Sequence, residues 1–167
     1  MKGDDEFMRA ALEEARAGLA EGGVPIGAVL VEEGRIIGRG RNRRVQEDDQ
    51  LLHAEIDCLR RSRLTGGYFG TTLYSTMMPC YLCAGAAVQF GIKRVVAGEA
   101  KSAPEARAFL ESHDIEVVDL NLDEPKELLA EFIRRYPGLW DEFLAEFIRR
   151  YPGLWDEFLA ECSPDIF

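Results

Sequence analysis

Two short segments of the sequence combine the residue types that hold a zinc ion. The first is the tripeptide H-A-E, which begins at His53, and the second is P-C-Y-L-C, which begins at Pro79 and carries thiols at Cys80 and Cys83. Thiolate sulfur and neutral imidazole nitrogen are ligands that zinc accepts, and three such ligands leave a fourth position for water. A catalytic zinc site requires that open position, so the pattern indicates a catalytic metal.

The spacing of the two cysteines favours a helix. Residues three apart lie on one face of a helix, so Cys80 and Cys83 can bind one ion together. Pro79 suits the first helical position, where a missing N–H costs nothing. The helix dipole and the metal both favour thiolate in the first turn. We therefore expect a helix that begins at this motif.

Glu55 is the candidate acid/base. Two thiolates formally cancel the charge of Zn²⁺, so the metal should acidify its water less than a site with three histidines would. A separate base is then needed, and Glu55, two residues after His53, can take a proton from the water and pass it to the leaving group.

A C-x-x-C motif also occurs in structural zinc half-sites, in redox pairs and in pairs of buried cysteines. A structural zinc site has four protein ligands. The residues that could supply a fourth zinc ligand stand singly in the sequence; they are Cys58, Cys162 and His113. A structural site also has no use for an acid/base such as Glu55, so the catalytic interpretation is favoured.

Composition narrows the class of protein further. The 167 residues are enough for one domain with a substantial core, and 47% of them are hydrophobic. The net charge of −10 argues against a protein that holds nucleic acid through phosphates. The sequence shows no membrane-spanning apolar run and no signal peptide, and the cysteines suggest no disulfide framework. We therefore expect a cytoplasmic protein without a membrane or nucleic-acid partner.

Apolar periodicity predicts strands that alternate with helices, after an initial helix and a hairpin. Such an order implies a mixed, largely parallel sheet with helices on both faces, and a ligand site beyond the carboxyl ends of the strands. Asp48 or Asp49 can cap the helix that carries His53. Helices are expected over 7–21, from the cap at Asp48 or Asp49 to residue 60, and over 80–90 and 104–110. Strands are expected over 24–31, 35–39, 71–75, 92–98 and 115–119.

Two features of the sequence admit alternative interpretations. The small residues Gly27 and Ala28 allow either a flat ligand or a helix to approach the backbone of the first strand.

Asn42 is an ordinary turn residue by type. Its carboxamide can also donate to and accept from the amide edge of a heterocycle.

The C-terminal part contains an exact duplication. Residues Ala130 to Leu144 read AEFIRRYPGLWDEFL, and residues Ala145 to Leu159 repeat them. Two copies are too few for a stacked-repeat architecture. We expect the first copy to pack over the core, with proline and glycine dividing it into helix, turn and helix. The predicted division is a domain over 1–144 and a duplicated helical segment over 145–167.

The chain resembles the small fungal and bacterial cytosine deaminases of the cytidine-deaminase-like superfamily. The resemblance implies a three-layer α/β/α fold with a mixed sheet of about five strands, a homodimer and one zinc per chain. It also implies hydrolytic release of ammonia from a free nucleobase. The segments that carry it are GGVPIG from 22, GRGRN from 38, HAEI from 53, TTLY from 71, PCYLCAGA from 79 and YPGLW from 136.

The resemblance also implies roles for single residues. His53, Cys80 and Cys83 would bind zinc, and Glu55 would shuttle the proton. The other implied roles are a hydrogen bond from Asn42 to the base, an N–H of Ala54 at its carbonyl edge, and closure of the pocket by Trp140.

The sequence departs from the family at the pocket wall. Phe143 stands where the family usually has an acidic residue, so Asp141 or Glu142 is the expected replacement. The family's aromatic lid has no match in residues 99–104. The resemblance makes cytosine the leading substrate, and the altered pocket wall leaves isocytosine or guanine as alternatives. The net charge disfavours tRNA adenosine as a substrate.

Overall fold

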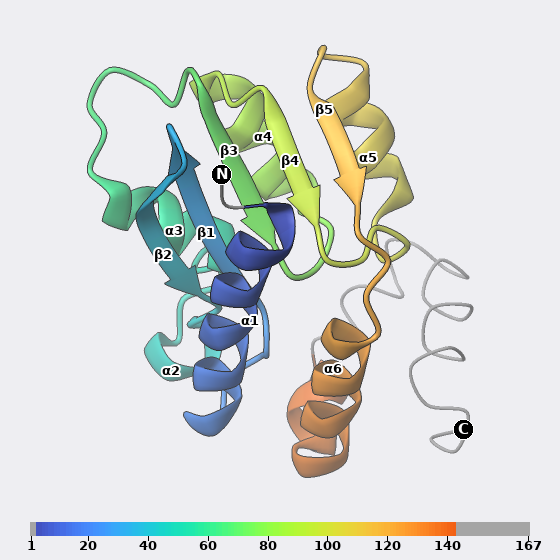
Figure 1. Cartoon of the computed structure of the whole chain (residues 1–167). Coiled ribbons are helices and arrows are strands. Elements are labelled where there is room, and N and C mark those ends of the chain that lie inside the picture. Colours follow the sequence, from blue (N-terminus) through green and yellow to red (C-terminus); the bar gives the residue numbers. More distant parts are fainter. Residues whose placement is uncertain (1–2, 143–167) are drawn as a thin grey trace.

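The computed structural model describes residues 3–142 and contains a five-stranded sheet in the order β2-β1-β3-β4-β5 (Figure 1). Strand β1 is antiparallel to both of its neighbours, while β3, β4 and β5 are parallel. The sheet is mixed, as expected, but parallel pairs do not predominate. The strands are β1 (Gly27–Glu32), β2 (Arg35–Arg41), β3 (Thr71–Ser75), β4 (Arg94–Ala97) and β5 (Glu116–Asp119).

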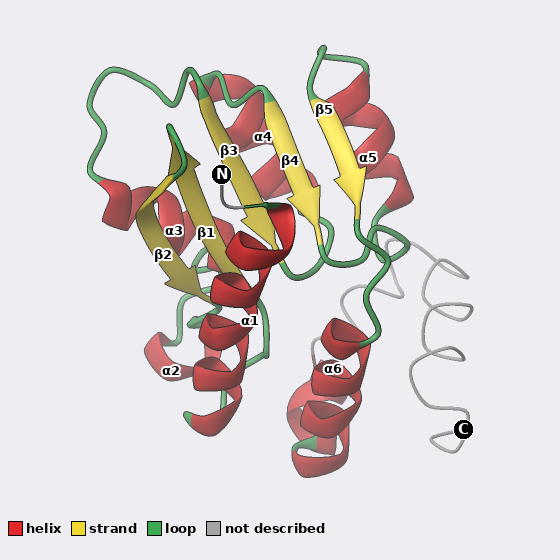
Figure 2. Cartoon of the chain, viewed as in Figure 1, coloured by secondary structure: helices red, strands yellow, loops and turns green. Residues whose placement is uncertain are grey.

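Helices cover both faces of this sheet, which confirms the three-layer α/β/α fold (Figure 2). Helices α1 (Asp4–Ala20) and α6 (Glu124–Arg135) pack on one face. The other face is covered by α3 (Ala54–Ser62), α4 (Tyr81–Phe90) and α5 (Pro104–Glu111). A short helix, α2 (Arg44–Glu47), lies between β2 and α3. Within residues 3–142, none of the helices combines the length and apolar composition needed to cross a membrane.

The alternation of side chains along β1 explains why both faces need a cover. Val29 and Val31 belong to the core beneath α1 and α6, whereas Ala28 and Leu30 belong to the core beneath α3, α4 and α5. Successive side chains of a strand point to opposite faces. A continuous apolar run therefore requires two helical layers.

Two glycines allow helices to approach the sheet closely. A Cβ atom at Gly27 would lie 2.0 Å from the carbonyl oxygen of Ala11 in α1, so Gly27 serves helix packing rather than a ligand. A Cβ atom at Gly40 would lie 2.2 Å from the backbone nitrogen of Cys58 in α3. Gly40 thus fixes the distance between β2 and the helix that follows the H-A-E motif.

The helix starts differ from the sequence prediction. Cys80 is the N-cap of α4, so Pro79 precedes the helix instead of occupying its first position. His53 is likewise the N-cap of α3. The proposed capping by Asp48 or Asp49 was wrong, because the Asp49 carboxylate accepts a hydrogen bond from the N–H of Leu51 (2.9 Å) within the preceding loop.

The first copy of the duplicated segment packs on the core through its described part. Tyr136 is the C-cap of α6, and residues 137–142 are helical again. Phe132, Ile133 and Trp140 are buried in the core beneath α1 and α6. The expectation for the second copy, residues 145–159, lies outside the described residues.

Candidate active site

The predicted zinc ligands meet where α3 and α4 begin. The ligand atoms of His53, Cys80 and Cys83 all lie within 4.8 Å of one another. His53 Nδ1 lies 3.4 Å from Cys80 Sγ and 3.7 Å from Cys83 Sγ. Tetrahedral zinc with ordinary Zn–N and Zn–S bonds separates its nitrogen and sulfur ligands by about 3.6 Å. The three side chains therefore fit a zinc ion.

The electrostatics of this cluster favour one thiolate strongly. A hydrogen bond from Cys83 outweighs burial and, with His53, lowers the pKa of Cys80 to about 4. The pKa of Cys83 is raised, first by its hydrogen bond to Cys80 and then by burial. Burial lowers the pKa of His53, but the Cys80 thiolate and Glu55 outweigh it and raise the value. Cys80 thus supplies one of the thiolates that a zinc ion requires.

Glu55 lies beside the ligands and is almost completely buried, with 4% of its surface exposed. The Ser75 hydroxyl donates to its Oε1 (3.1 Å), and Cys83 Sγ lies 3.3 Å from its Oε2. Burial raises the pKa of Glu55, and the neighbouring Cys80 thiolate adds to this. A carboxyl group with a raised pKa can both take up and release a proton near neutral pH.

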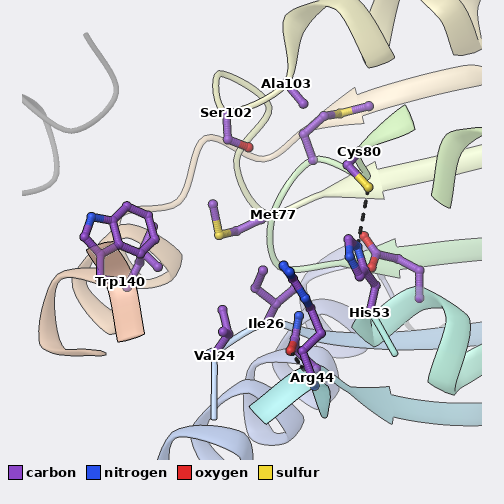
Figure 3. Close-up of a pocket in the computed structure, with 13 residues that line it drawn as sticks. Val24, Ile26, Arg44, His53, Met77, Cys80, Ser102, Ala103 and Trp140 are labelled. Atoms are coloured by element: carbon purple, nitrogen blue, oxygen red, sulfur yellow. Dashed lines mark hydrogen bonds between the residues drawn. The ribbon is translucent and has the colours of Figure 1, made fainter. Parts of the chain in front are cut away.

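A cavity of about 130 Å³ opens next to this cluster. His53, Glu55 and Cys80 line one side of it, which we call the metal wall. The rest of the lining comes from other segments, and we call it the loop wall; in Figure 3, Ser102 and Trp140 lie on the side away from His53. The loop wall consists of Val24, Ile26, Asn42, Arg44, Met77, Met78, Ser102, Ala103, Leu129 and Trp140.

The substrate-binding residues predicted from the sequence are only partly brought together. Asn42 is buried and lines the cavity, and its Oδ1 accepts a hydrogen bond from the N–H of Arg44 (3.1 Å). Its amide NH₂ group is therefore the donor that it offers to a ligand. Ala54, the first residue of α3, is fully buried between the two functional residues of its motif.

The C-terminal residues differ among themselves. Trp140 lines the cavity and is largely buried. Asp141 and Glu142 are exposed and are not among the lining residues, so neither stands in the place expected for the family's carboxylate. Phe143, the residue that prompted this expectation, lies outside the described residues.

Sequence reasoning missed most of the apolar lining and two polar residues. Ile26, Met77 and Leu129 come from three distant segments, Arg44 begins α2, and Ser102 comes from the loop after β4. Ile26 belongs to the GGVPIG segment and Ser102 to residues 99–104. Neither segment by itself specified a contact with a ligand.

Comparison with known proteins assigns the family. Residues 1–99 match the cytidine and deoxycytidylate deaminase zinc-binding region. The chain belongs to this family of zinc-binding deaminases, which agrees with the ligand geometry.

Individual relatives carry different activities. A cytosine deaminase of Candida albicans is 37% identical over 83% of this chain and 95% of its own length. A tRNA-specific adenosine deaminase of Buchnera aphidicola is 36% identical over 79% of this chain and 86% of its own. The solved structure of a guanine deaminase from Bacillus subtilis superimposes with a TM-score of 0.58 and 28% identity, over 66% of this chain and 73% of that one. These relatives share deamination and differ in the base.

Proposed function

We propose that this protein is a zinc-dependent hydrolase that deaminates a free pyrimidine-type base, with cytosine as the leading substrate. The observation that carries this proposal is the small cavity beside the zinc ligands and Glu55. Its volume is about 130 Å³, close to the cavity of about 150 Å³ that holds a benzene molecule in another protein. One six-membered ring matches this space better than a purine or a nucleoside.

His53, Cys80 and Cys83 would hold the zinc, which supplies an activated water molecule when bound. Glu55 takes a proton from that water and delivers it to the ring nitrogen next to the amino group. It then transfers the second proton to the amine, so the base and one water give the oxo base and ammonia. The buried position of Glu55, with its raised pKa, suits both halves of this transfer.

The remaining proposed contacts orient the base. Asn42 donates from its amide nitrogen to an acceptor of the ring, because its oxygen is already bonded to the N–H of Arg44. The N–H of Ala54 lies in the first turn of α3, where backbone donors have no partner inside the helix. Trp140 lines the cavity, and we expect it to cover the bound base.

The relatives support two rival substrates. Guanine is the substrate named for the Bacillus subtilis structure, but a purine needs more space than one ring, and isocytosine does not. Transfer RNA is the substrate named for the Buchnera aphidicola enzyme. A net charge of −10 opposes binding to a polyanion.

Ammonia release from a panel of bases tests the proposal. Zinc-loaded protein is incubated in parallel with cytosine, isocytosine, cytidine, adenine, guanine and tRNA. We expect release from cytosine, and none from cytidine or tRNA. Release from guanine or tRNA alone would overturn the assignment to a pyrimidine base, and release from none of them would overturn the activity.

The family resemblance also supports a cytoplasmic homodimer as part of this proposal. Tyr81, Leu82 and Phe90 of α4 are large apolar side chains that are 42–47% exposed, and a partner subunit would cover them. Light scattering on the purified protein should give twice the mass of the chain, 18.7 kDa; a monomer would remove this part of the proposal.

A further inference from the structure

Ser102 is a polar residue of the loop wall whose hydroxyl has no assigned role in the proposed reaction. It is 4% exposed and lines the cavity. Its Oγ is buried beside the Glu99 carboxylate, to which the hydroxyl donates. A hydroxyl that donates keeps two lone pairs that accept hydrogen bonds. A ligand with an N–H or O–H group can donate to one of them.

Glu99 holds the loop that carries this serine. The carboxylate is 1% exposed, and its Oε2 accepts hydrogen bonds from the N–H groups of Lys101 (3.1 Å) and Ser102 (3.2 Å). Burial raises the pKa of Glu99, and the hydrogen bond from the Ser102 hydroxyl is the first of the effects that oppose it. The Ser102 hydroxyl thus projects from a fixed turn beside a carboxylate.

The position of Ser102 relative to Asn42 identifies the part of a ligand that it can reach. Asn42 and Arg44 belong to one short segment, joined by a hydrogen bond, and Figure 3 shows Arg44 and Ser102 on opposite sides of the cavity. A pyrimidine with its amino carbon at the metal wall has two flanking edges. One is the ring nitrogen and carbonyl, which suits Asn42, and the other carries carbons 5 and 6.

We propose that Ser102 is a specificity-determining residue that selects bases with a hydrogen-bond donor at carbon 5, on the edge away from Asn42. The group at carbon 5 donates to a lone pair of the hydroxyl, which itself donates to Glu99. Unsubstituted cytosine has only C–H groups there and leaves this lone pair unpaired. This inference rests on the proposed function and refines its substrate class to 5-amino- or 5-hydroxy-type pyrimidines. Glu99 acts as a positioning residue for Ser102.

The test uses two ligands with the same number of heavy atoms, 5-aminocytosine and 5-methylcytosine. Ammonia release is measured for zinc-loaded wild type, Ser102→Ala and, as a control, Ser112→Ala, which removes an exposed hydroxyl outside the cavity. We expect wild type and the control to prefer the amino compound in kcat/KM by about tenfold or more. Ser102→Ala should abolish that preference while its zinc content stays unchanged.

Binding separates this inference from the proposed function. Calorimetric affinities of both compounds for zinc-loaded protein are compared in the same variants, so turnover is not required. A preference for the amino compound that disappears in Ser102→Ala supports the role of Ser102 even if no ammonia is released. An equal preference in wild type and Ser102→Ala, or equal losses for both compounds, would overturn it, because a purely structural serine would affect both ligands alike.

Discussion

The metal wall and the loop wall of the cavity are built in different ways. Each residue of the metal wall stands at or just after the start of a helix. His53 and Cys80 are the N-caps of α3 and α4. The loop wall is assembled from several separate segments of the chain, including the loop after β4 and the helical residues after Tyr136.

The two walls carry different parts of the proposed function: catalysis and recognition of the base. The metal wall carries the groups that would bind zinc and move protons, and its positions are fixed by helix packing against the sheet. The loop wall carries groups that would contact the base, such as Asn42, Ser102 and Trp140. Changes in the first wall should therefore abolish activity, and changes in the second should alter preference among bases.

Loss of a zinc ligand should have the largest effect. Cys83→Ala removes one of three ligands, so we expect zinc to be lost on dialysis and activity to disappear for every base. Metal analysis and ammonia release on the same sample test this. Cys58→Ala is the control, since Cys58 is a buried residue of α3 that is no member of the cluster; retention of tightly bound zinc in Cys83→Ala would contradict the ligand assignment.

A change at Gly40 should disturb the metal wall without touching a ligand. In Gly40→Ala the new methyl group meets the backbone of α3, so the helix must move, at a cost of about 1–3 kcal/mol in the free energy of unfolding. We expect weaker zinc binding as well. Gly85→Ala is the matched control, because a Cβ there meets nothing within 4 Å and should stabilise α4 by up to about 1 kcal/mol. Equal melting temperatures of the two variants would refute the packing argument.

Asn42→Asp should weaken substrate binding on the loop wall. The carboxylate keeps an oxygen for the N–H of Arg44 but loses the amide donor. We expect kcat/KM for cytosine to fall about 10- to 100-fold with zinc content unchanged. Steady-state kinetics with metal analysis measures this; an undiminished kcat/KM would show that Asn42 makes no contact with the base.

The smallest effect should come from an ion pair outside both walls. Arg94 donates two hydrogen bonds to the carboxylate of Asp4 (2.9 and 2.8 Å), and this contact is the main cause that lowers the pKa of Asp4. A lowered folded-state pKa gives stability that is present above the unfolded value, about 3.9, and is lost as pH falls through the folded value.

The variant Asp4→Asn tests this linkage. Its melting temperature should lie below that of wild type at pH 7, and the gap should shrink as pH falls below about 4. The activity at pH 7 should stay unchanged. If the difference in melting temperature between wild type and variant is constant from pH 7 to pH 3, protonation of Asp4 does not affect stability, and the linkage argument is wrong.

The metal wall could be predicted from the sequence, whereas most of the loop wall could not. His53, Glu55 and Cys80, together with the buried ligand Cys83, lie in two short motifs whose chemistry depends on residue type and spacing. The neighbouring strands follow simple periodicity. The loop wall depends on how distant segments pack. Asp141 and Glu142 illustrate this, because their place in the sequence suggested a contact and the helical turn exposes both.

The helix starts and the glycines show a second limit. Whether Cys80 is a cap or a first-turn residue depends on the dihedral angles of the preceding loop, which the residue types do not specify. The reason for a glycine at position 27 was ambiguous in the sequence, because a bound ligand and a packed helix both require a residue without a side chain. Only the position of α1 distinguishes the two.

The most direct test of the proposed chemistry is the variant Glu55→Gln, with zinc content and ammonia release measured on one sample. Glutamine keeps the size of the side chain but neither takes up nor releases a proton. Full zinc occupancy with turnover of cytosine reduced about 10²- to 10⁴-fold is the predicted result. Wild-type turnover in the variant would contradict the role of Glu55, and loss of zinc together with activity would indicate a structural role instead.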